Sequence, residues 1–167
     1  MIHQYNFPTT IRYGLGAVRE LPDVLKSHGL RRPLLVTDRS LASLPPFHRV
    51  HALLSRFEVA VHSEIFGNPL VSQAVAGGVS FRNHAADSIV ALGGGAALDV
   101  AKCIAVLAHH DGDLLEYEAF LPSPRPIDRE VPPIFTIPTT AGTGSEVGRS
   151  AVVSDDRTHQ KKIIFSP

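Results

Sequence analysis

The sequence predicts an α/β fold in which a parallel β-sheet carries helices on both faces and a short β-hairpin follows at the carboxyl terminus. Short apolar runs alternate with longer segments whose apolar residues recur at helical spacing. Several of these runs are uninterrupted, which is typical of strands buried on both faces. Helices between consecutive strands indicate βαβ units. A chain of 167 residues is long enough for one such domain.

The amino-terminal half is expected to begin with a strand at residues 10–13, which lies at a sheet edge. The apolar residues of 17–28 then recur at helical spacing until Gly29 ends the helix. The further elements expected in this half are a strand at 33–37, a helix at 46–56, a strand at 58–62 and a helix at 70–84.

The carboxyl-terminal half continues the alternation and then changes character. We expect a strand at 88–92, a helix at 97–108, a proline-rich loop at 122–133, a strand at 134–137, and two strands at 150–154 and 161–165 joined by a polar turn. The sheet with helices on both faces is therefore Rossmann-like, and we expect residues 1–167 to form a single dinucleotide-binding domain.

Composition excludes several classes of function. Lys plus Arg equals Asp plus Glu, at 16 each, and no basic cluster suggests a nucleic-acid partner. The most apolar segment, 88–108, contains three glycines, Asp99 and Lys102, so it is not expected to cross a membrane. The single cysteine, Cys103, allows no intrachain disulfide, and the first ten residues do not resemble a secretory signal. We therefore expect a cytoplasmic protein.

A glycine turn separates the strand at 88–92 from the next helix. In Leu92-Gly93-Gly94-Gly95, glycines let the backbone turn tightly and approach a ligand, and the free N–H groups of the helix that follows suit a pyrophosphate. The pattern differs from the usual dinucleotide fingerprint, because Leu98 stands where the third glycine would fall. The alternative is a tight turn without a ligand.

Two more strand ends carry polar residues. Asp38 ends an early strand, where a carboxylate can accept hydrogen bonds from an adenosine ribose or simply cap the helix that follows. The segment 138–147, PTTAGTGSEV, interleaves hydroxyl residues with glycines, as in a loop that binds phosphate, ribose or a nicotinamide amide. It lacks the GxSxG motif, so Ser145 is not expected to be a hydrolase nucleophile.

These motifs together resemble the iron-containing (group III) alcohol dehydrogenase family. The likeness rests on GGGxxxD at 93–99, PTTAGTGSEV at 138–147 and AVVSDDRTHQKK at 151–162, in that order and spacing, and it covers essentially the whole chain. PTTAGTGSEV is the specific part, because the glycine turn is shared with glycerol dehydrogenases and dehydroquinate synthases. The resemblance implies NAD as the cofactor, with NADP disfavoured by Asp38.

The resemblance also implies a role for each matching position. Asp38 and Asn68 would lie near the adenosine. The pyrophosphate turn would be formed by Gly94, Gly95 and Ala96 and closed by Asp99. The cofactor would also be lined by Thr139, Thr140 and Thr143, and its nicotinamide ribose would be faced by Ser150 and Lys161. Many relatives have serine at the position of Ala96, so only the backbone donors are expected to act there.

In the resembled family a second, helical domain supplies an aspartate and three histidines that bind a divalent metal, iron or zinc. Pro167 is reached before any of them, so we expect no catalytic or metal-binding residue in this chain. No HExxH motif occurs, and His48, His51, His109 and His110 are interpreted as surface or capping residues.

The implied function is NAD-dependent hydride transfer between a small alcohol or aldehyde and the nicotinamide. This chain would supply the cofactor-binding half and be inactive alone, and a homodimer through the region of residues 10–13 is expected. Two alternatives stay open. One is a stand-alone nucleotide-binding or dimerisation module without catalysis, and the other is a maleylacetate reductase or polyol dehydrogenase of the same family.

Overall fold

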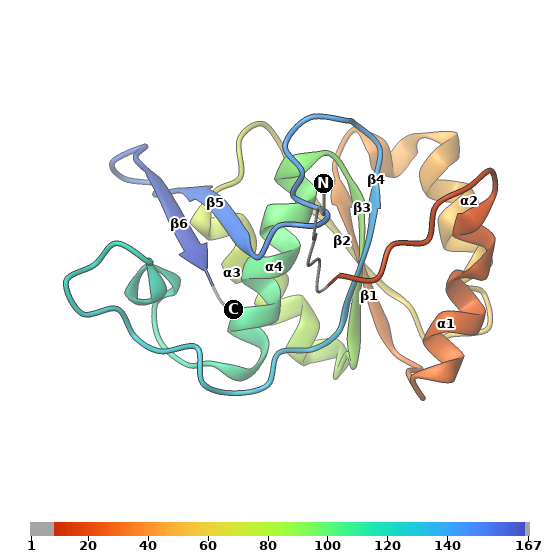
Figure 1. Cartoon of the computed structure of the whole chain (residues 1–167), viewed down its shortest axis with the longest axis horizontal. Helices are drawn as coiled ribbons and strands as arrows, with labels where there is room; N and C mark the ends of the chain where they lie inside the picture. Colours follow the sequence, from red (N-terminus) through yellow and green to blue (C-terminus); the bar gives the residue numbers. More distant parts are fainter. Residues whose placement is uncertain (1–8, 166–167) are drawn as a thin grey trace, which may run out of the picture.

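A four-stranded parallel sheet forms the centre of the molecule, in a computed structural model that describes residues 9–165. Residues 1–8, which include most of the segment that does not resemble a secretory signal, and residues 166–167 lie outside the described part. The strands are β1 (Pro33–Asp38), β2 (Ala60–Ile65), β3 (Ser88–Gly93) and β4 (Ile134–Pro138), in the spatial order β2-β1-β3-β4 (Figure 1). All three pairings are parallel, as predicted.

Helices cover both faces of this sheet, which confirms the predicted architecture. Helices α1 (Leu21–Ser27) and α2 (Pro45–Leu53) lie on one side, and α3 (Val71–His84) and α4 (Gly95–His109) on the other (Figure 1). Strand β1 shows why the sheet needs both layers. Leu34 and Val36 belong to the core with α3 and α4, whereas the alternate residue Leu35 belongs to the core with α1 and α2.

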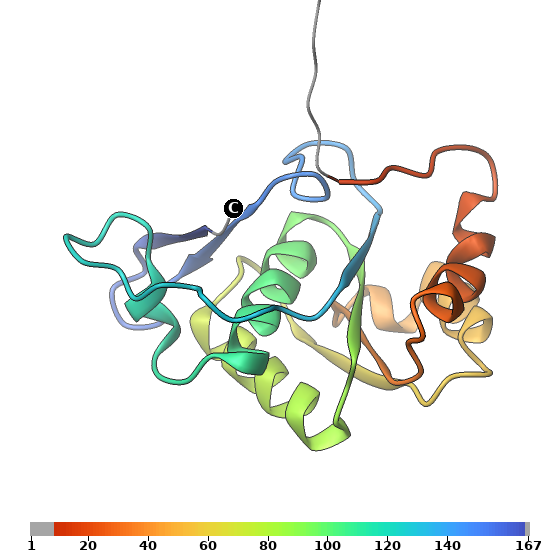
Figure 2. The same ribbon diagram turned by 60° about the horizontal axis from the view of Figure 1, so that its bottom comes forward.

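The predicted hairpin is present with the predicted ends, as β5 (Ser150–Ser154) and β6 (Lys161–Phe165). Its strands are antiparallel, with Ser150 opposite Phe165 and Ser154 opposite Lys161. Ala151, Val153 and Ile164 pack into the core formed by α3 and α4. The hairpin therefore lies beyond α4, on the opposite side of this helix from the sheet (Figures 1 and 2).

The strand expected at residues 10–13 is wrong. These residues form no regular element, and the side chains of Ile11 and Tyr13 are 62% and 99% exposed. A strand needs a hydrogen-bonded neighbour, and within residues 9–165 no backbone pairing reaches this segment. The helix expected at 17–28 begins with a 3-10 turn, η1 (Ala17–Glu20), which is followed by α1. Pro22 lies in the first turn of α1, where proline is tolerated.

Smaller differences concern where elements begin. Strand β2 begins two residues later than predicted and extends to Ile65, which pairs with Asp38. Helix α4 begins at Gly95, so the last glycine of the turn is already helical and Gly94 is the residue that precedes the helix. Two short 3-10 helices, η2 (Leu41–Ser43) and η3 (Leu114–Tyr117), were not predicted.

Helices α3 and α4 cross closely at Gly77. A Cβ atom on this residue would lie 2.2 Å from Cδ1 and 2.6 Å from Cγ1 of Ile104, and 3.2 Å from the imidazole Cδ2 of His62.

Cys103, next to Ile104 on α4, is fully buried, and burial raises the pKa of its thiol. In the part of the chain that the structure describes, no helix has both the length and the apolar character needed to cross a membrane.

Candidate functional site

The carboxyl ends of the parallel strands bring Asp38 and the glycine turn together. Strands β1 and β3 are neighbours, so their last residues, Asp38 and Gly93, meet at one edge of the sheet. A Cβ on Gly93 would lie 3.6 Å from the carboxylate Oδ2 of Asp38 and only 2.8 Å from the Cβ of Ala97. The φ of Gly93 is 154°, so both its backbone and its surroundings require glycine.

The turn delivers the amino end of α4 to the same edge. Gly94 is extended, and its carbonyl accepts the first helical hydrogen bond, from the Leu98 N–H at 3.2 Å. The N–H groups of Gly95, Ala96 and Ala97 precede that bond and have no acceptor within the helix. They carry the positive end of the dipole of a 15-residue helix, which suits a phosphate.

The loop at 139–149 passes directly over the glycine turn (Figures 1 and 2). The Thr139 N–H donates to the carbonyl of Gly93 at 3.0 Å, which fixes the start of the loop. A Cβ on Gly94 would lie 3.3 Å from Oγ1 of Thr140, and a Cβ on Gly95 would lie 2.8 Å from Oγ1 and Cγ2 of Thr143. The structure thus brings the predicted threonines onto the predicted glycines, with the threonines themselves exposed to solvent.

Asp99 occupies the structural centre of this region. Its Oδ1 accepts the Ser145 hydroxyl at 2.6 Å, and its Oδ2 accepts the Val152 N–H at 3.2 Å. Both carboxylate oxygens are therefore engaged within the protein. Asp99 ties α4 to the loop and to β5, while a direct contact with a cofactor stays a prediction.

Lys102 and Ser145 belong to the same cluster, and neither is among the site residues predicted from the sequence. The Lys102 ammonium donates to Oγ of Ser145 at 2.8 Å and to the carbonyl of Ser150 at 2.7 Å, and lies 3.6 Å from Oδ1 of Asp99. Burial lowers the pKa of Lys102, and the Asp99 carboxylate offsets part of this shift. The available signal was two charges three residues apart in an otherwise apolar helix.

Asp38 does cap the next element, as the alternative interpretation held. Its Oδ1 accepts the Leu41 N–H at 2.8 Å at the start of η2, while Oδ2 lies toward the glycine turn. Capping uses one oxygen, so it does not prevent the other from binding a ribose. Asn68, in the loop after β2, is exposed at the same edge of the sheet.

Ser150 and Lys161 lie apart. Ser150 begins β5, next to the Lys102 ammonium, whereas Lys161 pairs with Ser154 at the other end of the hairpin. The side chain of Lys161 is exposed. Of the two, only Ser150 lies with the loop and the glycine turn, while the predicted cofactor contact of Lys161 stays untested.

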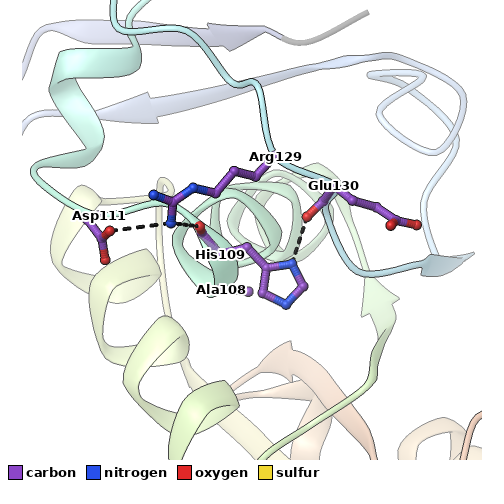
Figure 3. A pocket seen from close by; sticks show the side chains of 5 residues that line it. All are labelled: Ala108, His109, Asp111, Arg129 and Glu130. Carbon is purple, nitrogen blue, oxygen red and sulfur yellow. Dashed lines mark hydrogen bonds and ion pairs between the residues drawn. The ribbon is translucent and has the colours of Figure 1, made fainter.

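Two surface hollows lie elsewhere. One is at the carboxyl end of α4, opposite the glycine turn, and is lined by Ala108, His109, Asp111, Arg129 and Glu130 (Figure 3). Another lies between α3 and the hairpin turn, with Ser72, Asp113 and Asp156 among its lining residues. Neither hollow includes a residue of the glycine turn.

The four histidines interpreted as surface or capping residues have structural partners, and His110, which caps α4, is buried rather than at the surface. His109 Nδ1 lies 2.7 Å from the carbonyl of Glu130, and His110 accepts the Arg129 N–H at Nε2. His48 and His51 both pack against the ring of Phe47. Within residues 9–165, no three His, Cys, Asp or Glu side chains gather in a way that could hold a metal ion.

Comparison with known proteins agrees with this geometry. A family model described as iron-containing alcohol dehydrogenase matches residues 8–167. The chain is 35% identical over 161 residues to choline dehydrogenase of Bacillus subtilis, covering 95% of this chain and 40% of that protein. It is 37% identical over 145 residues to 4-hydroxybutyrate dehydrogenase of Cupriavidus necator, covering 87% and 38%.

A solved structure gives the same result in three dimensions. Sulfoacetaldehyde reductase from Bifidobacterium kashiwanohense, solved in complex with NAD+, superimposes with a TM-score of 0.88 and 30% identity, covering 99% of this chain and 43% of that one. The chain therefore spans about two fifths of the length of the relatives that it matches.

Proposed function

Because this chain belongs to the iron-containing alcohol dehydrogenase family, we propose that residues 1–167 form a cofactor-binding domain that binds NAD(H) at the carboxyl edge of the parallel sheet. The observation that carries the proposal is the position of Thr143 over Gly95, beside the free N–H groups of α4. A phosphate donor set and a hydroxyl-rich loop therefore lie next to one another, with no side chain on the glycines between them.

The residues present fit a dinucleotide. The N–H groups of Gly95 and Ala96 would hold the pyrophosphate. The glycines let the threonine loop approach the turn closely, because a Cβ on Gly94 or Gly95 would meet a threonine side chain. The free Oδ2 of Asp38 would accept hydrogen bonds from the adenosine ribose, and the loop threonines would bind the remaining part. Asn68, Asp99, Ser150 and Lys161 keep the roles that the family resemblance implies, as predictions.

The nicotinamide, when bound, supplies the hydride chemistry. The chain's own residues bind and orient the cofactor, and the negative charge of Asp38 would favour NAD over NADP because a 2′-phosphate would meet a like charge. The described residues do not fit the family's divalent metal, so no step through a metal is assigned to them. We expect the chain by itself to lack alcohol dehydrogenase activity.

The substrate class proposed for the whole protein is a small alcohol or aldehyde. The names of the relatives point to different compounds, among them choline, 4-hydroxybutyrate and sulfoacetaldehyde, and each name belongs to that relative alone. A maleylacetate reductase or polyol dehydrogenase activity stays open. A nucleotide-binding module without catalysis is the second candidate, favoured by the completeness of the glycine turn within this chain.

Two further properties are proposals. We propose a homodimer, supported by the exposed apolar side chains of Ile11, Tyr13 and Leu15 in the segment before η1, here called the exposed arm. We also propose a cytoplasmic location, supported by a single cysteine that is fully buried and so suits a reducing compartment.

Titration calorimetry of the chain with NADH and with AMP tests the proposed function. We expect both to bind, NADH more tightly, because it spans the glycine turn and the loop. A thermal shift assay with NAD should show stabilisation as well. Absence of any binding or stabilisation at millimolar NADH or NAD would contradict the assignment. Binding without turnover in the full-length protein supplied with iron or zinc would favour the module without catalysis.

A further inference from the structure

The Lys102 ammonium has a complete set of oxygen partners within the protein. An ammonium group has three protons, and three oxygens surround this one, on Ser145, Ser150 and Asp99. The side chains of Lys102 and Asp99 are only 14% and 13% exposed, so both charges are largely removed from water. Burying such a pair costs free energy, and removing one partner leaves the other charge buried and unpaired.

The cluster connects through Ser145 to the glycine turn. Ser145 is buried, and its hydroxyl accepts a hydrogen bond from the Lys102 ammonium and donates one to the Asp99 carboxylate. Its backbone N–H donates to Oγ1 of Thr143 at 3.2 Å. Thr143 in turn lies against Gly95. A continuous series of contacts therefore runs from the Lys102 ammonium to the loop residue that covers the start of α4.

The remaining anchors of the loop are weaker. Its start is held by the Thr139 N–H, and its middle by the hydroxyl of Thr136, which lies 3.4 Å from the carbonyl of Glu146. The threonines and glycines of 139–143 are themselves exposed. The position of the loop relative to the glycine turn thus depends on Lys102 and Asp99.

We propose that Lys102 is a positioning residue that holds the 139–149 loop over the glycine turn in the geometry that receives the loop-facing half of the dinucleotide. This inference rests on the proposed function. Lys102 acts through Ser145 and Thr143 and does not itself need to touch the cofactor. Loss of the Lys102 side chain should weaken the binding of NADH, because NADH extends past the glycine turn under the loop. The binding of AMP should be unaffected, because AMP lacks the nicotinamide half.

The matched control is Lys162, which forms a second largely buried ion pair. Its ammonium lies 3.1 Å from Oε2 of Glu118, with side chains 22% and 13% exposed, and it joins β6 to the segment after η3 rather than to the loop. Lys102→Met and Lys162→Met therefore remove comparable ion pairs. Only the first should change the cofactor site.

The experiment measures the dissociation constants of NADH and AMP for the wild-type chain and both variants, and the rate of tryptic cleavage after Arg149, an exposed residue at the end of the loop. We expect Lys102→Met to weaken NADH about tenfold, to leave AMP unchanged and to accelerate cleavage after Arg149. Lys162→Met should leave all three unchanged. Ser145→Ala should weaken NADH in the same sense, and it decides the question if Lys102→Met does not fold.

Three results would overturn the inference. Folded Lys102→Met could bind NADH as the wild type does, it could lose affinity for NADH and AMP equally, or Lys162→Met could weaken NADH binding as much as Lys102→Met does. In each of these cases a wild-type chain that binds both ligands would leave the proposed function standing. A wild-type chain that binds neither would remove the proposed function and this inference together.

Discussion

Thr143 occupies the space that a side chain on residue 95 would need, with its Oγ1 and Cγ2 atoms both 2.8 Å from the position of a Cβ on Gly95. The glycine is therefore required by the loop above it as well as by any ligand. Sequence reasoning assigned both residues to the cofactor, and the structure shows that each limits the position of the other.

Gly95→Ala should weaken NADH binding about tenfold, because the added methyl group displaces Thr143 and lies in the path of the phosphates. The fold should persist, since alanine favours the first turn of a helix more than glycine does. Titration calorimetry measures the affinity. The control is Gly142→Ala in the same loop, where a Cβ would meet no atom within 4 Å. Equal effects of the two substitutions would contradict the account.

Asp38→Asn should relax discrimination against NADP by about tenfold, because it removes the charge that would repel a 2′-phosphate. The amide oxygen can still accept the Leu41 N–H, so stability should change little. Asp38→Ala, which loses the cap as well, should cost about 1 kcal/mol of unfolding free energy. An unchanged ratio of NAD to NADP affinity in Asp38→Asn would show that Asp38 is only a cap.

His62 should make the fold sensitive to acid. Burial lowers its pKa below the ordinary value of 6.5, and its Nε2 is buried without a hydrogen-bond partner among residues 9–165. The unfolded chain then binds the proton more readily than the folded one, so the free energy of unfolding is highest above pH 6.5 and falls as the pH drops toward the folded pKa. Urea denaturation across this range measures the slope.

His62→Gln should flatten that slope, while His48→Gln, on an exposed histidine, should leave it unchanged. A wild-type stability that stays constant between neutral pH and pH values well below 6.5 would contradict the assignment to His62.

Gly77→Ala should lower the free energy of unfolding by about 1–3 kcal/mol, because its methyl group would overlap Ile104 in a close-packed core. Ile104→Ala leaves room for that methyl group. In a double-mutant cycle, Gly77→Ala should therefore cost less in the Ile104→Ala background. Additive costs would show that the two residues do not compete for the same space.

The proposed homodimer can be tested through its exposed arm. Light scattering over a dilution series should show a dimer that dissociates on Tyr13→Ser, since this side chain is 99% exposed in the single chain. A monomer at high micromolar concentration would contradict the dimer. A dimer that survives the substitution would place the interface on another surface.

The sequence predicted those parts of the fold that depend on local patterns. Uninterrupted apolar runs marked β1 and β3, and the polar turn between 150–154 and 161–165 set both ends of the hairpin. The strand predicted at 10–13 is wrong because a short segment forms a strand only where another strand lies beside it. The missed 3-10 helices are single turns, too short to establish a periodicity.

The candidate site was predictable where residues adjacent in sequence make it. The glycine turn and the threonine loop each form one continuous motif. The Lys102 cluster was missed because it joins residues 43 and 48 positions apart, which pair only once the loop and β5 have folded onto α4. The separation of Ser150 from Lys161 follows from antiparallel pairing, which sends the two strand beginnings to opposite ends of the hairpin.

Because Cys103 is buried, the rate at which its thiol is labelled measures how often the core opens. It is the single thiol of the sequence, it has no exposed surface, and its raised pKa keeps it from reacting as a thiolate while the core is closed. A thiol reagent can therefore modify it only in molecules whose α4 has separated from the sheet and from α3. When reclosure is faster than modification, the labelling rate divided by the rate for an exposed thiol equals the equilibrium constant for opening. Comparing that rate with and without NAD would show whether cofactor binding slows the opening of the core, without any introduced probe.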